Sequence, residues 1–174
     1  MWKIKIMRRD KMKIKALAAV MVLCMAAGTK VHAFGIGAQV NFSAGDIFAP
    51  GASLLISPSD ITHLAFNWYL DFDKTNIVGL TLDVSPLTLP ISKFNAGSFN
   101  FTLGVGLFAN IVFAEDTLFN GGLRIPLGVN LLLGQRVLEI FAQAAPSFGL
   151  HFLPKVELSN PFFPIALGAR LWFR

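Results

Sequence analysis

Apolar and polar residues alternate along most of the chain after residue 33. In the clearest stretch, every second residue from Phe99 to Phe113 is apolar, and most residues between them are glycine, asparagine or threonine. Successive side chains of a β-strand point to opposite faces, so this period predicts a strand with one apolar face and one small or polar face. The pattern recurs in seven further stretches: 34–43, 51–57, 62–72, 76–85, 123–133, 138–152 and 165–174.

Turn-forming residues separate the eight stretches, in segments 44–50, 58–60, 73–75, 86–98, 114–121, 134–137 and 154–161. We therefore predict an all-β fold, an eight-stranded antiparallel up-and-down transmembrane β-barrel. An even number of strands puts both termini at the periplasmic end of such a barrel. Segment 86–98 departs from the scheme, because it should be a short periplasmic turn but is long and contains Pro86 and Pro90.

Alternation alone would also suit a water-soluble barrel such as a lipocalin. The composition of the polar face distinguishes a membrane barrel from a soluble one. A face in contact with water should carry roughly a quarter or more charged residues, whereas this one is mostly Gly, Asn, Ser, Thr and Gln. A charge on a lipid-facing position near the bilayer centre costs about 2–4 kcal/mol. The charged residues within the predicted strands all fall on the polar face: Asp71, Asp83, Arg124, Glu139, Arg170 and Arg174. We conclude that lipid surrounds the apolar face.

The first 33 residues have the parts of a cleavable secretory signal. A basic segment comes first, then the apolar stretch 16–28, then a cleavage site between Ala33 and Phe34. The apolar stretch is shorter than the roughly 20 residues that a membrane-spanning helix needs. Met7 and Met12 are alternative starts, and Leu23 before Cys24 does not fit a lipid-attachment site. We predict a signal over 1–33 and a barrel over 34–174.

The positive charge of the chain belongs to the predicted signal. The whole sequence has a net charge of +5, but residues 34–174 hold seven Lys or Arg against nine Asp or Glu. The barrel itself is therefore slightly acidic, and no nucleic-acid partner is expected. It also lacks cysteine, which excludes disulfides and thiol catalysis.

The charged residues of the polar face are the candidate site. An unpaired charge inside a barrel filled with side chains is costly, so these residues should pair. From their positions along the strands we predict a cluster of Asp83, Glu139 and Arg170 toward the periplasmic end, and a pair of Arg124 with Asp71 near the outer end. The favoured role is structural, filling and stiffening the lumen. A gate or a binding site is the alternative.

Residues that could carry other chemistry are poorly placed for it. Ser147, His151 and Glu139 share a face, as in a hydrolase, but Ser147 and His151 lie roughly 13 Å apart along one strand. His63 and His151 are too isolated to predict a metal site. We predict no catalytic, metal or cofactor-binding residue and no enzyme activity, with a lipid-modifying enzyme as the least favoured alternative.

The last strand resembles the C-terminal assembly signal of outer-membrane proteins through Gly168, Leu171 and Phe173, although Arg174 follows the final aromatic residue. Segments 34–41, 122–133 and 138–150 resemble a family of small spirochaetal outer-membrane barrels, broadly similar to OmpX, OmpW and OmpA. The resemblance implies the outer membrane of a diderm bacterium, outer-membrane lipid around a monomer, insertion by the barrel-assembly machinery, and relatives that bind host proteins at the cell surface.

Two functions therefore stay open from the sequence. The first is a barrel with a structural or surface-interaction role. In the surface-interaction role its outward connections would make the contacts, including contacts with host proteins. The second is an OmpW-like conduit or binding site for small hydrophobic molecules. Five large apolar residues on the polar face could line such a pocket or merely plug the lumen: Leu55, Phe108, Val112, Leu132 and Phe141. A general aqueous pore is not expected, because eight strands leave no open channel.

Overall fold

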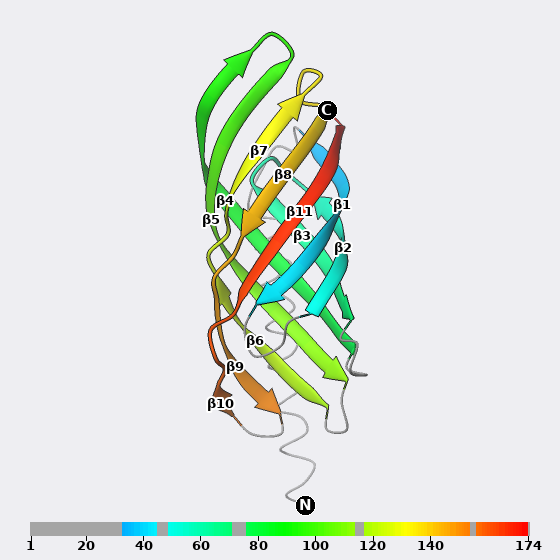
Figure 1. The fold of residues 1–174 in the computed structure, drawn as a ribbon, viewed down its shortest axis with the longest axis vertical. Helices are drawn as coiled ribbons and strands as arrows, with labels where there is room; N and C mark the ends of the chain where they lie inside the picture. The colour runs from blue at the N-terminus through cyan, green and yellow to red at the C-terminus, as the bar shows by residue number, and fades with distance from the viewer. Residues whose placement is uncertain (1–32, 45–48, 71–75, 114–116, 154–155, 174) are drawn as a thin grey trace, which may run out of the picture. The chain divides into compact units, whose positions relative to one another are not determined.

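A computed structural model describes residues 33–44, 49–70, 76–113, 117–153 and 156–173. The predicted signal, residues 1–32, lies outside them. The described residues form strands of one antiparallel sheet (Figure 1): β1 (Phe34–Ala44), β2 (Ala49–Ser57), β3 (Thr62–Leu70), β4 (Asn76–Phe94), β5 (Gly97–Phe113), β6 (Leu118–Arg124), β7 (Leu127–Leu133), β8 (Leu138–Ala144), β9 (Ser147–Leu153), β10 (Glu157–Leu158) and β11 (Phe163–Phe173). In this part of the chain, no helix is long and apolar enough to cross a membrane.

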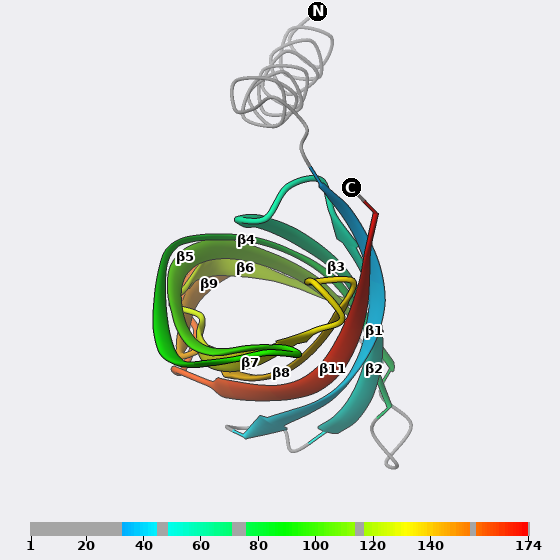
Figure 2. The ribbon, with the colours of Figure 1, turned by 90° about the horizontal axis from the view of Figure 1, so that it is seen from above.

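The sheet closes on itself, as the view along the barrel shows (Figure 2). Strand β1 pairs with β11 along its whole length, from Phe34 opposite Phe173 to Ala44 opposite Phe163. Strand β5 pairs with both β6 and β7, and these pair in turn with β9 and β8. Strands β6 and β7, which are consecutive in the chain, therefore together take the place of one long strand. Strands β8 and β9 do the same. The predicted all-β fold, a closed eight-stranded antiparallel barrel, is confirmed.

Proline residues account for the two interruptions in the wall. Pro126 separates β6 from β7, and Pro146 separates β8 from β9. A proline has no N–H to donate to the ladder, but its carbonyl can still accept. Gly104 N–H donates to Pro126 O over 2.8 Å, and Ile125 N–H donates to Pro146 O over 2.9 Å. These bonds hold neighbouring strands together across the breaks, so the wall stays continuous.

Segment 86–98 is not a loop, contrary to the sequence prediction. Strand β4 runs on to Phe94 and β5 starts at Gly97, so a tight turn joins two long strands. The pairing register shifts twice, between Val84 and Leu87 and between Pro90 and Ser92. Such bulges insert unpaired residues, which lets a strand contain proline without losing its partner. The hairpin extends past its neighbours at the end of the barrel where β1 begins and β11 ends (Figure 1).

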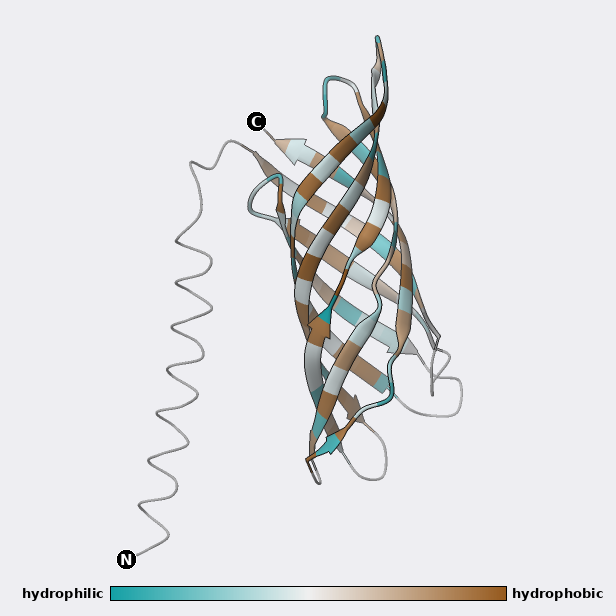
Figure 3. Cartoon of the chain, turned by 90° about the vertical axis from the view of Figure 1, so that its left-hand side faces the viewer, coloured by the Kyte–Doolittle hydropathy of each residue, from teal (hydrophilic) through white to brown (hydrophobic). Residues whose placement is uncertain are grey.

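The barrel carries its apolar side chains outside and its charged ones inside. Leu54 is 68% exposed on the outer face, and many large apolar side chains share that face. Figure 3 shows hydrophobic and hydrophilic residues alternating along the strands. The buried charged residues all come from the predicted polar face: Asp83, Arg124, Glu139 and Arg170. The distribution is the reverse of that in a water-soluble protein, where apolar residues gather inside.

Candidate functional site in the barrel lumen

Glu139 and Arg170 form a buried ion pair between neighbouring strands. They lie opposite each other in the pairing of β8 with β11, and Arg170 Nη1 is 3.1 Å from Glu139 Oε2. Trp172 Nε1 donates to the same oxygen over 2.7 Å, and Asn130 Nδ2 donates to Glu139 Oε1 over 2.7 Å. The carboxylate thus accepts from three donors, as a buried charge requires. The sequence prediction named Glu139 and Arg170 as neighbours, and the structure places them in contact.

The Arg170 guanidinium also contacts two aromatic rings and a histidine. It lies 4.9 Å from the ring centre of Phe141 and 5.4 Å from that of Trp172, within the range of cation–π attraction. Its Nη1 donates to His63 Nδ1 over 3.1 Å. Arginine can only donate, so Nδ1 of His63 accepts and the imidazole is neutral with its proton on Nε2. Sequence reasoning set His63 aside as isolated, because Arg170 and Trp172, which contact it, lie more than 100 residues away along the chain.

Arg124 pairs with Asp83, which is a different grouping from the one predicted. Arg124 Nε lies 3.2 Å from Asp83 Oδ1, so the two groups form an ion pair. The geometry does not allow a hydrogen bond between these two atoms. Both residues stand opposite Gly106 of β5, one on each side. Because glycine has no side chain, the two charged groups meet across it. The prediction that Arg124 and Asp83 lie at different heights is wrong, because it ignored the stagger between neighbouring barrel strands. Asp71, the predicted partner of Arg124, lies outside the described residues.

The pairing across Gly106 gives a first prediction. A Cβ at position 106 would overlap the Asp83 carboxylate and come within 2.9 Å of the Leu82 carbonyl oxygen. Gly106→Ala should therefore separate the ion pair and lower the free energy of unfolding by about 1–3 kcal/mol, the usual cost of overpacking. Urea unfolding in detergent measures the change. Gly121→Ala is the matched control, since its Cβ would lie 3.1 Å from its nearest neighbour. Equal stability of the two variants would contradict the prediction.

Amide and hydroxyl side chains form a second part of the lumen that the sequence prediction missed. Asn41 donates to Ser53 Oγ, and Ser53 in turn donates to Asn67 Oδ1 over 2.6 Å, so the chain crosses β1, β2 and β3. On the other wall, Asn100 donates to Asn130 Oδ1 over 2.8 Å, and Asn130 continues to Glu139. The sequence does show asparagine and serine on one face of these strands. Only the pairing register of the strands shows which of these side chains form hydrogen bonds with each other.

Apolar side chains fill the spaces between the polar groups. Leu55, Ala65 and Phe141 pack together in the lumen, and a second cluster is formed by Tyr69, Ile77 and Val112 with Leu118 against it. Phe108 stacks edge-on against Phe162 at 5.0 Å between ring centres. Leu132 is buried as well. The large apolar residues of the polar face therefore pack against other side chains and plug the lumen.

Contacts across the lumen join opposite walls of the barrel. Gln143 of β8 donates to Asp83 Oδ2 of β4 over 3.4 Å, and Arg170 of β11 reaches His63 of β3. The polar cavity left between these groups measures only about 40 Å³, room for no more than a few water molecules. This interior is suited to fixing the barrel's cross-section.

The residues considered for hydrolysis are held apart. Ser147 Oγ donates to the carbonyl of Ala145 over 2.7 Å, and Glu139 is held by Arg170. His151 lies opposite Asn120 and Glu157, on β6 and β10. Within the described ranges, no three His, Cys, Asp or Glu side chains gather as metal ligands. The assembly-signal residue Gly168 lies between β1 and β8, where a Cβ would crowd Phe141 and the Ala38 carbonyl; its part in assembly stays a prediction, as do those of Leu171 and Phe173.

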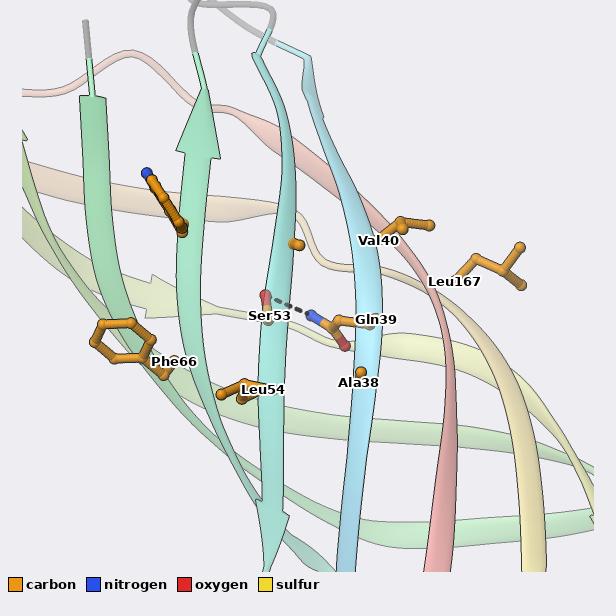
Figure 4. Close-up of a pocket in the computed structure, with 9 residues that line it drawn as sticks. Ala38, Gln39, Val40, Ser53, Leu54, Phe66 and Leu167 are labelled. Carbon is orange, nitrogen blue, oxygen red and sulfur yellow. Dashed lines mark hydrogen bonds between the residues drawn. The ribbon is translucent and has the colours of Figure 1, made fainter.

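The outer wall carries a shallow apolar groove over β1, β2, β3 and β11 (Figure 4). Its volume is about 390 Å³. The small side chains of Ala38 and Ala52 form its floor, and bulky side chains surround them: Val40, Leu54, Phe66, Trp68 and Leu167. Beneath the floor, Gln39 donates to Ser53 Oγ over 3.5 Å on the lumen side.

The chain is a closed eight-stranded barrel with an apolar exterior. No protein-family model matches its sequence, and no curated protein matches it. Among solved structures, it is similar to the N-terminal β-barrel domain of OprF from Pseudomonas aeruginosa, with 14% identity, 80% of this chain and 97% of that chain covered, and a TM-score of 0.46. It is also similar to Ail, the attachment invasion locus protein of Yersinia pestis, with 13% identity, 81% and 97% coverage, and a TM-score of 0.45. Neisserial surface protein A shows 12% identity, 81% and 96% coverage, and a TM-score of 0.45.

Proposed function

We propose that this chain is an integral outer-membrane β-barrel of a diderm bacterium, with a structural or surface-interaction role. The observation that carries the proposal is the reversed distribution of side chains. Charged residues such as Asp83 and Arg170 are buried, whereas Leu54 and many other large apolar residues are exposed on the outer wall. Monomeric soluble proteins rarely expose contiguous apolar patches larger than a few hundred Å². Hydrocarbon is the medium that suits this wall.

Strand length supports the same proposal. A transmembrane β-strand needs about 9–11 residues. Strands β1 and β11 have 11 residues each, and β2 and β3 have 9 each. Closure removes every open sheet edge from these four strands, which hydrocarbon requires because it offers no hydrogen-bond partners. The pairing of Phe34 with Phe173 puts both ends of the barrel chain at one rim, which we assign to the periplasm.

The surface-interaction role belongs to the opposite rim. It would use the connections between β1 and β2, β3 and β4, β5 and β6, and β9 and β11, each of which contains residues outside the described ranges. A host protein as partner, and membership of the spirochaetal OmpX- and OmpW-like family, therefore remain predictions from the resemblance. A conduit through the lumen is disfavoured, since Phe141, Phe108 and the buried ion pairs would have to move to open one. No catalytic role is proposed.

Fractionation of producing cells tests the membrane location. We expect the protein in the outer-membrane fraction, extracted only by detergent, and migrating faster on gels before boiling than after it. Protease added to intact cells should cut at the outward connections while the strands stay protected. A processed protein that is soluble and monodisperse without detergent would refute the proposal.

A further inference from the structure

The tips of the β4–β5 and β7–β8 hairpins enclose an open cavity of about 580 Å³, here called the rim cavity. Ligand sites commonly measure roughly 300–1,000 Å³. Its polar lining includes Thr88, Lys93, Asn95, Asn100, Gln135 and Arg136. Strand β4 continues past the end of its pairing with β3, so the β4–β5 hairpin extends beyond β3. The inward face of this hairpin and the β7–β8 turn form the two sides of the cavity.

Backbone hydrogen bonds fix the frame of the rim cavity. Gly134 N–H donates to the Ala96 carbonyl over 3.1 Å, which ties the two hairpin tips together. On the other side, Trp172 N–H donates to the Val137 carbonyl over 2.8 Å, which ties the same turn to β11. A ligand that binds here would therefore meet a frame already in place and would not have to order it.

The β7–β8 turn holds two long polar residues in an unfavourable backbone conformation. Gln135 has φ of 56° and Arg136 has φ of 73°, directly after Gly134 at 58°. Residues with a side chain are uncommon in this left-handed region. They persist where the surrounding structure forces them, and they are enriched at ligand-binding and active sites. Glycine or asparagine would suit these turn positions better, yet the chain places an amide and a guanidinium there, on the wall of the cavity.

The charge of the rim cavity is positive. Lys93 and Arg136 both line it, and among the described lining residues none carries a carboxylate. Neither cation takes part in an ion pair within the described part of the chain. A guanidinium matches the geometry of phosphate through two parallel hydrogen bonds, and an ammonium adds a compact charge. We infer that the rim cavity binds a phosphate-bearing anion, with Lys93 and Arg136 as its charged ligands.

The phosphate can come from a soluble ester or from the headgroup of an anionic phospholipid. Residues 87–94 of β4 pair only with β5 among the described strands, so they form an edge. Leu87 and Leu89 on the outer side of this edge are 41% and 49% exposed. A lipid whose acyl chains lie against these leucines could place its phosphate over the edge and into the cavity. This lipid source rests on the proposed membrane location, whereas binding of a soluble ester does not.

Two titrations of the protein, purified from cells in dodecyl maltoside, test the inference. Calorimetry with glycerol 3-phosphate reports the soluble ester, and native mass spectrometry with phosphatidylglycerol against phosphatidylcholine reports the lipid. Lys93→Gln and Arg136→Gln should each weaken binding about tenfold, as expected for loss of a charge-assisted hydrogen bond. The double variant should bind neither probe, and Arg136→Lys should keep part of the affinity. Lys155→Gln, which follows β9 in the sequence, is the matched control for loss of one charge.

The outcomes separate the two sources and the two proposals. Charge-dependent binding of either probe supports the inference and names the source. Absence of saturable binding by both probes, or equal binding by the wild type and the double variant, would overturn it. Unchanged heat-modified gel mobility shows that the variants are folded barrels. A failure of the membrane proposal would appear separately, as protein that stays monodisperse without detergent.

Discussion

Arg170→Met should lower the free energy of unfolding by about 3–5 kcal/mol, the cost of leaving one member of a buried ion pair without its partner. Methionine has a similar length, so the loss is one of charge and hydrogen bonds more than of volume. Glu139 would keep Asn130 and Trp172 as donors but lose its cation. Phe141 and Trp172 would lose the cation against their rings. Urea unfolding in detergent, followed by gel mobility without boiling, gives the change.

A second substitution separates the contribution of the ion pair to stability from the contribution of side-chain packing. Glu139→Gln removes the negative charge and keeps an oxygen that can accept from Trp172. The double variant Glu139→Gln with Arg170→Met should therefore recover at least about 1 kcal/mol relative to the sum of the two single changes, as coupled neighbours do. Full heat resistance in Arg170→Met alone would show that the pair contributes nothing to stability, and purely additive losses would show that the two residues act independently.

Leu54→Arg should destabilise the barrel in lipid by about 2–4 kcal/mol if hydrocarbon covers the outer wall. Leu54 is 68% exposed and lies near the middle of β2, opposite Ala38 and Phe66 of the neighbouring strands. In water the same change would cost almost nothing, because an arginine on a surface is well hydrated. Equilibrium unfolding from phospholipid vesicles gives the difference. The sign and size of this effect therefore report the medium around the barrel.

Leu158→Arg is the matched control for Leu54→Arg. Leu158 is 82% exposed, but it lies in the two-residue strand β10 at one end of the barrel. Near the membrane surface an arginine costs only about 0–1 kcal/mol. A large loss for Leu54→Arg with a small loss for Leu158→Arg fits a band of hydrocarbon around the strands. Small losses for both would mean that water reaches the outer wall.

The sequence was sufficient for the strands and for the sides that their residues face. A period of two is a local property, so the burial of Asp83, Arg124, Glu139 and Arg170 could be predicted without knowing which strands pair. Their partners could not, because pairing depends on the stagger between strands. Arg124 meets Asp83 only because Gly106 stands between them, a relation among three strands that no local pattern contains.

Two further features escaped prediction for physical reasons. Pro86 and Pro90 indicate a turn when read locally, yet both lie in an extended hairpin. Pro86 falls in a bulge, and Pro90 lies where β4 pairs only with β5 among the described strands, so that the strand is an edge; both places tolerate a missing N–H donor. The sequence alone assigns no role to Trp172 and leaves His63 isolated. Their roles around Arg170 and Glu139 become visible only once β3, β8 and β11 are placed around one lumen.

Closure between β1 and β11 also governs how this chain must fold. The pair joins the first described strand to the last, so among the described strand pairs it has the greatest separation along the chain. Contacts of long range form slowly, because the entropy lost in bringing distant segments together precedes any gain. Until β11 arrives, the growing sheet has two open edges, each able to pair with another chain. Among the described strands, the eleven-residue β11 is thus both the last to be synthesised and the one that ends exposure to aggregation.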